Sequence, residues 1–106
     1  MTARVWAGRV PALAAAREYA HAGIAPGGTH ANWRFLADWL TFDPEIVKEE
    51  QLLLCDAQTS GGLLAAVPES QAEEVIAGLR SAGVSAAAIV GRIEETGDGQ
   101  IFVSAG

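Results

Sequence analysis

Two glycine-rich stretches hold the side chains of this 106-residue chain that are best suited to chemistry. The first covers residues 26–32 (Pro-Gly-Gly-Thr-His-Ala-Asn), and the second covers residues 56–62 (Asp-Ala-Gln-Thr-Ser-Gly-Gly). Consecutive glycines let neighbouring backbone N–H groups converge on one point, which suits the oxygens of a phosphate group. Hydroxyl and amide side chains in both stretches add further donors. Each stretch is therefore a candidate phosphate-binding loop.

Ordinary local structure is the competing interpretation of both stretches. The first has the composition of a helix-to-helix turn with a polar cap. The second has the composition of a helix end that leads into a strand, with Asp56 and Ser60 binding orphan backbone groups. Asp56 is also a weak candidate ligand for a divalent cation, because hard cations prefer oxygen ligands. Composition and spacing leave these alternatives open.

The spacing of the remaining residues excludes several common sites. The chain contains neither the Gly-Lys pair of a Walker P-loop nor a Gly-x-Gly-x-x-Gly motif. Its one cysteine and two histidines do not have a recognised zinc spacing. His21 lies where a helix is expected to end, so its cation would offset the helix dipole; His30, in the first stretch, is the better functional candidate. Cys55 follows three leucines and is expected to be a small buried hydrophobe rather than a nucleophile.

Charge and hydrophobicity narrow the class of protein. The formal net charge is −6 and Lys48 is the only lysine, which argues against a nucleic-acid partner. No apolar run approaches the roughly 20 residues of a membrane span, so no membrane partner is expected. The first residues lack the apolar core of a signal peptide, which predicts a cytoplasmic protein. A single cysteine excludes an internal disulfide.

The elements that position the two stretches alternate between helical and extended patterns. In chain order we expect a helix over residues 11–22, a short helical turn reaching residues 36–37, a strand over 39–42, a helix over 43–55, a strand over 62–67, a helix around 72–79, a strand over 86–93 and a strand over 100–104. Gly23 and Gly83 are expected to end helices, and Asp43 to cap one. The nearly all-apolar strand 62–67 should be covered on both faces, and the last two strands should pair as a hairpin.

This order predicts an α+β (layered α/β) fold, with helices packed on a mixed β-sheet. The pattern gives residues 1–10 no clear partner. The length is that of a single domain, large enough for one core.

Taken together, the two stretches resemble selenophosphate synthetase (selenide, water dikinase). Residues 23–32 are similar to the family's Gly-x-x-Pro-Gly-Gly-Thr-x-x-Asn, and residues 56–64 match its Asp-Pro-Gln-Thr-Ser-Gly-Gly-Leu-Leu except at Ala57. The resemblance runs from about residue 11 to residue 103. It implies that residues 11–106 are part of a C-terminal domain like that of the aminoimidazole ribonucleotide (AIR) synthetase superfamily, preceded by a poorly assigned segment over 1–10.

The resemblance also implies an activity that this chain should not perform alone. Such enzymes make selenophosphate from selenide, ATP and water, and they release AMP and orthophosphate. They hold Mg²⁺ and ATP on an N-terminal domain, which also carries the catalytic Cys or selenocysteine. The chain is therefore expected to contain no catalytic residue, to bind neither cofactor tightly, and to meet selenide and ATP only through that missing domain. A free-standing binding or assembly module that has lost the reaction is the alternative.

By the same resemblance, both stretches face the cleft between the two domains of the full enzyme. The residues expected to line this cleft are Gly27, Gly28, Thr29, Asn32, Gln58, Thr59, Ser60 and Gly61, with Asp56 as the weak metal candidate. Half a domain should also expose an apolar surface, for which the aromatic residues Trp6, Trp33, Phe35 and Trp39 are candidates. Such a surface favours self-association, so we expect a homodimer or a higher oligomer.

Overall fold

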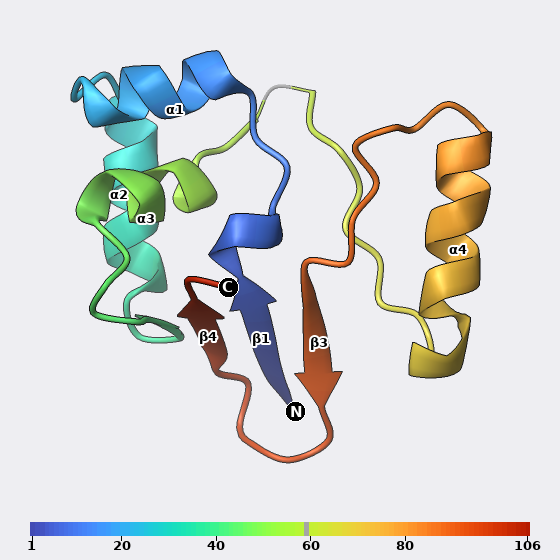
Figure 1. The fold of residues 1–106 in the computed structure, drawn as a ribbon. Coiled ribbons are helices and arrows are strands. Elements are labelled where there is room, and N and C mark those ends of the chain that lie inside the picture. Colours follow the sequence, from blue (N-terminus) through green and yellow to red (C-terminus); the bar gives the residue numbers. More distant parts are fainter. Residues whose placement is uncertain (59) are drawn as a thin grey trace.

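The computed structural model describes residues 1–58 and 60–106, and it shows helices packed on one mixed sheet. The strands are β1 (Thr2–Trp6), β2 (Leu40–Phe42), β3 (Gly91–Glu94) and β4 (Ile101–Ser104). The helices are the 3-10 turn η1 (Ala7–Arg9), α1 (Ala14–His21), α2 (Gly27–Leu36), α3 (Lys48–Cys55) and α4 (Glu69–Ser81). Helices α1, α2 and α3 gather on one side of the molecule, whereas α4 stands apart beyond β3 (Figure 1). The predicted α+β fold class is confirmed.

Residues 1–10, for which the sequence predicted no element, contain a central strand of the sheet, β1. The strand order is β2-β4-β1-β3, with β1 antiparallel to β3 and parallel to β4. The predicted hairpin between the last two strands is wrong, because β1 lies between them. The connecting loop passes around the start of β1, where the Met1 ammonium donates to the Gly97 carbonyl and the Gly99 N–H donates to the Met1 carbonyl. Gly97 and Gly99 have φ of 106° and 88°, which favours glycine at both positions.

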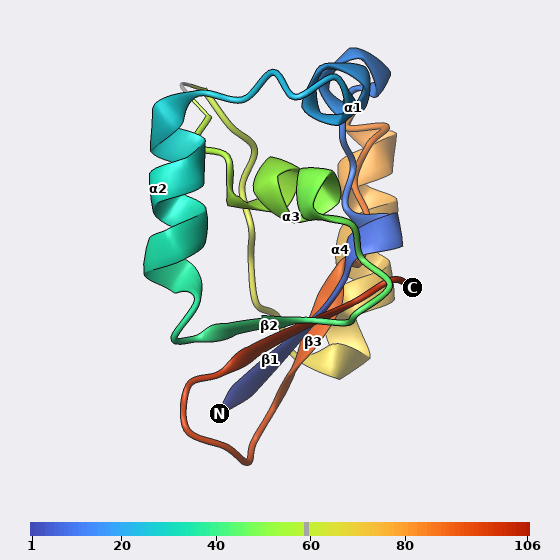
Figure 2. The same cartoon turned by 90° about the vertical axis from the view of Figure 1, so that its left-hand side faces the viewer.

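The core is small and lies between the sheet and the segment that leads into α3. Its buried centre is formed by Ala7, Ile46 and Val103. Partly buried apolar side chains from β1, β2, β4 and α3 pack against it, namely Val5, Leu40, Phe42, Leu54 and Ile101. Helix α3 lies next to α2 above the sheet (Figure 2). The core thereby fixes α3, and α3 in turn positions α2.

Several helix boundaries differ from the predicted ones. Helix α1 begins at Ala14 rather than Pro11, although Gly23 follows its end with φ of 81°, as a left-handed stop requires. Helix α2 is a ten-residue helix rather than a short turn. Helix α3 begins at Lys48, because the Asp43 N–H donates to the Val103 carbonyl and so extends the ladder between β2 and β4. Asp43 therefore does not cap a helix.

The strand predicted over residues 62–67 is absent. The side chains of Leu63 and Leu64 are 102% and 85% exposed, and residues 60–67 make no backbone hydrogen bond with another described residue. Of the strand predicted over 86–93, only the end lies in a ladder, as β3. An apolar pattern indicates a segment that can form a strand. The strand also needs a neighbouring segment whose backbone N–H and C=O groups form hydrogen bonds with its own. Within the described residues, no helix is long and apolar enough to cross a membrane.

Candidate functional site

The first glycine-rich stretch forms the beginning of α2 rather than an open loop. Pro26 is the N-cap, and its carbonyl accepts hydrogen bonds from the Thr29 and His30 N–H groups at 3.0 and 3.4 Å. The first N–H groups of a helix have no partner within it, so those of Gly27 and Gly28 are free to bind a ligand. Both glycines are exposed, and nothing lies within 4 Å of where their side chains would be. The predicted nest is thus replaced by a helix N-terminus that is also suited to anions.

The second stretch begins where α3 ends. Cys55 is the last residue of α3, and Asp56 follows it in an extended conformation. Gln58, Ser60 and Gly61 are exposed, and a side chain added at Gly61 would lie 3.3 Å from the Cβ of Gln58. Thr59, a predicted cleft residue, lies outside the described part of the chain.

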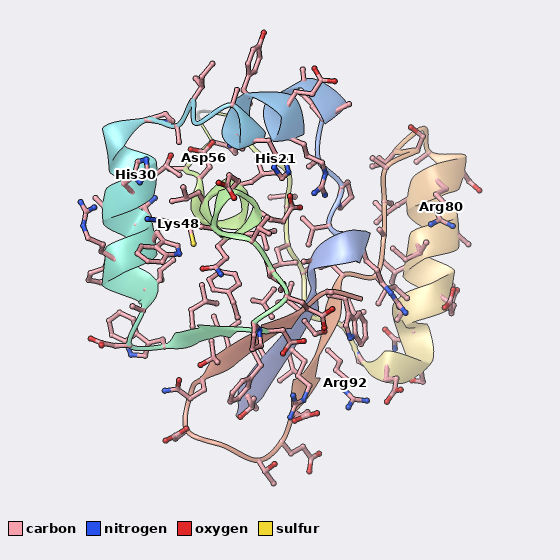
Figure 3. All side chains as sticks on the ribbon, turned by 60° about the vertical axis from the view of Figure 1, so that its left-hand side comes forward. His21, His30, Lys48, Asp56, Arg80 and Arg92 are labelled. Carbon is pink, nitrogen blue, oxygen red and sulfur yellow. The ribbon has the colours of Figure 1, made fainter. Side chains whose placement is uncertain are left out.

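Side-chain hydrogen bonds join the two stretches, although they are separated by more than 20 residues in the chain. The Thr29 hydroxyl donates to one carboxylate oxygen of Asp56, and the side-chain amide of Gln58 donates to the other. The Asn32 amide donates to the Cys55 carbonyl at 3.0 Å, which satisfies one of the carbonyls left free at the end of α3. Asp56 comes from the end of α3 and lies close to α2 in Figure 3. We call this set of residues, Thr29, Asn32, Cys55, Asp56 and Gln58, the α2–α3 junction.

The α2–α3 junction brings together most of the residues predicted from the sequence. It directly includes Thr29, Asn32 and Gln58, and the exposed Gly27 and Gly28 precede Thr29 on the same turn of α2. Ser60 and Gly61 lie next to it in the chain but make no side-chain or backbone hydrogen bond with other described residues. The structure therefore groups the first stretch with Asp56 and Gln58 more closely than with the Ser-Gly-Gly end of the second.

The carboxylate of Asp56 changes what this site can bind. A negative charge near the first turn of α2 is favourable, because the N-terminal end of a helix carries a partial positive charge. The same carboxylate accepts the donors of Thr29 and Gln58, so these donors do not face a ligand in this arrangement. The groups left for a ligand are the N–H groups of Gly27 and Gly28 and the side-chain carbonyl of Gln58. A phosphate that approaches them also approaches Asp56 and needs a cation between the two charges.

The described residues do not form a complete metal site by themselves. Among residues 1–58 and 60–106, no group of three or more His, Cys, Asp or Glu side chains is placed to hold a metal ion. Magnesium is commonly bound by one or two carboxylates together with phosphate oxygens and water. The carboxylate of Asp56 and the side-chain carbonyl of Gln58 are oxygen donors of the kind that magnesium prefers.

Cys55 and His21 lie in the positions that the sequence predicted, one buried and the other at the end of a helix. Cys55 is a free, buried thiol, and burial raises its pKa, so it is poorly suited to nucleophilic attack. His21 is the last residue of α1 and lies 3.9 Å from Glu50, which also pairs with Arg17. His30 is on α2 and partly buried.

A second contact between α2 and α3 was not predicted. The Trp33 indole N–H donates to the Gln51 side chain at 3.0 Å, and Gln51 donates to the Ile46 carbonyl at 2.9 Å. The Lys48 ammonium lies 4.8 Å from the centre of the Trp33 ring. Trp33 follows Asn32 directly, so neighbouring residues of α2 both bind α3. The only signal in the sequence is the tryptophan itself, which the sequence analysis predicts to be exposed.

The family follows from comparison with known proteins. Residues 15–104 match the family described as AIR synthase related protein, C-terminal domain. The chain belongs to this family. The match covers both glycine-rich stretches and every element from α1 to β4 apart from the first residue of α1.

Curated relatives narrow the resemblance further. Proteins named selenide, water dikinase are similar to this chain: one from Pelobacter propionicus is 39% identical over 87% of the chain, one from Carboxydothermus hydrogenoformans is 41% identical over 82%, and one from Pseudomonas aeruginosa is 50% identical over 69%. The resemblance noted from the sequence is thereby confirmed. These matches cover 26%, 25% and 21% of the relatives. The chain thus spans about a quarter of the length of the proteins it resembles.

Proposed function

We propose that this chain is the C-terminal portion of a selenide, water dikinase and forms one wall of its active-site cleft. The names of the relatives support the reaction, which makes selenophosphate from selenide, ATP and water. The observation that carries the role of the cleft wall is the α2–α3 junction. It uses a buried hydroxyl and a carboxylate to hold the start of α2, with its free N–H groups, against the end of α3.

In this proposal, the chain binds and positions phosphate groups and does not perform the transfer. The N–H groups of Gly27 and Gly28 bind phosphate oxygens, and fixed donors of this kind stabilise the charge that develops during phosphoryl transfer. Ser60 and Gly61, which follow the α2–α3 junction in the chain, add further donors. Asp56 holds Thr29 and Gln58 in place and shares a cation with the phosphates. In the complete enzyme, Mg²⁺ would neutralise phosphate charge.

The remaining parts of the reaction are assigned to the part of the enzyme that this chain does not match. The described residues hold no metal cluster, and the one thiol is buried with a raised pKa. We therefore expect no AMP when the purified chain is mixed with ATP, Mg²⁺ and selenide. We also place the protein in the cytoplasm, where its free cysteine would stay reduced.

A chimera tests the proposed function. The chain would replace the matching segment of the Pseudomonas aeruginosa relative, to which it is 50% identical over 74 residues. We expect the folded chimera to form AMP in the presence of selenide. An Asp56→Asn substitution in the same chimera should lower the rate about 10-fold or more, because it removes the charge that holds Thr29 and faces the cation. A folded chimera with no activity would instead support the alternative of a binding or assembly module.

A further inference from the structure

A cavity of about 370 Å³ lies beside α4. One wall is the face of α4 that carries Glu73, Ile76 and Arg80, whose spacing of i, i+3 and i+7 places them on one side of the helix. The other wall is formed by Arg9, the last residue of η1, and by residues 88–89, which precede β3. Helix α4 lies on the other side of β3 from α2 and α3 (Figure 1), so this cavity is separate from the cleft wall proposed above.

The two arginines of this cavity carry charges that no described carboxylate neutralises. Acidic side chains outnumber lysine and arginine by 13 to 7 in the whole chain. The arginines that form ion pairs with described carboxylates are nevertheless Arg4, Arg17 and Arg92, and not Arg9 or Arg80. Two cations that line one cavity repel each other, so an anion that binds both is favoured.

Both guanidinium groups are held by contacts that leave N–H donors free. Nε and Nη2 of Arg80 donate to the Ala87 carbonyl at 3.2 and 3.0 Å. The end of this guanidinium, formed by Nη1 and the second N–H of Nη2, is left for a ligand and matches the two oxygens of a carboxylate. The Arg9 guanidinium carbon lies 4.4 Å from the centre of the Trp6 ring, which supports one face, and its N–H groups have no described acceptor. Each arginine can therefore bind a carboxylate without giving up the contact that positions it.

The rest of the lining limits what can bind. Ile76, Ala88 and Ile89 are partly buried and give the cavity an apolar surface. Of the described lining residues, Glu73 alone is acidic, and it has no ion-pair partner among the described residues. The volume is near the lower end of the range for ligand pockets, which suits a small metabolite better than a nucleotide.

We propose that this cavity binds a free acidic amino acid, for which L-glutamate is the probe. Its two carboxylates pair with Arg9 and Arg80, its ammonium pairs with Glu73, and its methylene groups contact the apolar lining. Every charge in the cavity then has an opposite partner, and the cavity and ligand together carry no net charge. A simple dicarboxylate leaves Glu73 facing an anion, and a neutral amino acid leaves one arginine unpaired. This inference does not depend on the proposed enzymatic function.

Isothermal titration calorimetry of the purified chain with L-glutamate tests this proposal. We expect a 1:1 complex with a Kd of about 1 mM or lower. Glutarate lacks the ammonium and L-glutamine lacks the second carboxylate, so each should bind at least about 3-fold more weakly. Because the ligand joins α4 to η1, amide hydrogen exchange should slow in α4, a helix with no buried residue.

Substitutions separate the three ion pairs. Arg9→Gln and Arg80→Gln should each weaken the binding of L-glutamate about 3-fold or more. Arg34→Gln is the matched control, because it removes the same charge from an exposed position on α2, and it should leave the affinity unchanged. Glu73→Gln should weaken the binding of L-glutamate but not that of glutarate, which has no ammonium. Glu74→Gln, on the next residue of α4 and outside the cavity, should affect neither.

Arg80→Gln also removes the hydrogen bonds to Ala87, so Arg9→Gln is the deciding variant. Unchanged affinity in Arg9→Gln would overturn the proposal. Equal weakening by Arg9→Gln and Arg34→Gln, or equal affinity for L-glutamate, glutarate and inorganic phosphate, would show unspecific attraction of anions and overturn it too. So would the absence of any binding heat at L-glutamate concentrations up to about 10 mM.

Discussion

The α2–α3 junction and residues 62–67, which we call the apolar segment, are neighbours in the chain, but the contacts of their residues differ. In the junction, polar side chains meet each other and the backbone, and Thr29 is only 3% exposed. In the apolar segment, side chains that favour burial lie in solvent and the backbone has no described partner. The difference teaches that in this part of the fold the polar residues hold the local structure together, while the apolar run takes no part in the core that the described residues form.

Helix α4 resembles the apolar segment, because it also lacks buried side chains. None of its residues is buried, and Val75 and Leu79 on its apolar stripe are exposed. A cavity of about 370 Å³ lies between α4, Arg9 and residues 88–89. The Arg80 guanidinium donates to the Ala87 carbonyl at 3.2 and 3.0 Å and ties α4 to the segment that precedes β3 (Figure 3). The chain between residues 60 and 90 is thus held more loosely than α1, α2 and α3.

The largest difference in the free energy of unfolding should come from two glycine substitutions, one at a packed position and one at an open position. An alanine side chain at Gly91 would collide with the Arg4 carbonyl of β1, whereas nothing lies near Gly62. We expect Gly91→Ala to lower the free energy of unfolding by about 3 kcal/mol, and Gly62→Ala to change it by less than about 0.5 kcal/mol. Urea denaturation measures both. Equal effects would mean that β3 shifts freely or that the apolar segment is packed.

Removing the carboxylate of the α2–α3 junction should have the next largest effect. Asp56→Ala leaves the buried hydroxyl of Thr29 without its acceptor, at a cost of about 2 kcal/mol. For a domain of this size, that corresponds to a fall in Tm of roughly 10 °C. The exposed Asp38 is the control, and Asp38→Ala should leave Tm nearly unchanged. A double substitution with Thr29→Val should cost less than the sum of the two single changes, and strict additivity would contradict the contact.

The labelling rate of the Cys55 thiol tests whether the α2–α3 junction opens more readily when it, rather than the apolar segment, is changed. It does so without measuring global stability. It is buried next to Asp56 and burial raises its pKa, so we expect labelling by a disulfide reagent at pH 8 to be at least about 10-fold slower than for a free cysteine. Asp56→Ala should speed labelling by loosening the end of α3. Leu64→Asp, in the apolar segment, should not. Fast labelling of the wild-type chain would show that the junction opens readily.

The sequence predicted the partners within the site better than their geometry. Gly-Gly-Thr-x-x-Asn and Asp-x-Gln were placed at one cleft by family resemblance, and the structure brings Thr29, Asn32, Asp56 and Gln58 together. The open loop predicted for the first stretch was wrong, because consecutive glycines after Pro26 also suit the exposed first turn of a helix. Nor does residue type reveal that Asp56 accepts both donors. That depends on where the end of α3 packs.

The errors in the fold have a common physical cause. Helices α1 and α4 were predicted because their hydrogen bonds are local, and the glycines that end them are visible in the sequence. Strands depend on distant neighbours. Residues 2–6 form a central strand only because β3 and β4 lie on either side, while residues 62–67 have a stronger strand pattern but no strand beside them among the described residues. Similarly, Trp33 was predicted to be exposed, yet its indole is bound by Gln51, whereas Phe35 and Trp39 are exposed as expected.

The smallest effect we predict concerns the charged edge strand that contrasts with the uncharged apolar segment. Hydrogen bonding from Arg4, with the nearby Arg92 charge, lowers the pKa of Glu94 below its ordinary value of 4.5. A carboxyl with a lowered pKa in the folded state stabilises the fold above that ordinary value, and this stabilisation is lost as the pH falls through the lowered pKa. Because the pair is exposed, the change in stability should be slight. Titration of the Glu94 carboxyl by NMR should show the lowered pKa, and Arg4→Gln should raise it toward 4.5, whereas Arg9→Gln should not. A pKa that does not respond to Arg4→Gln would mean that this ion pair does not form on the edge strand β3.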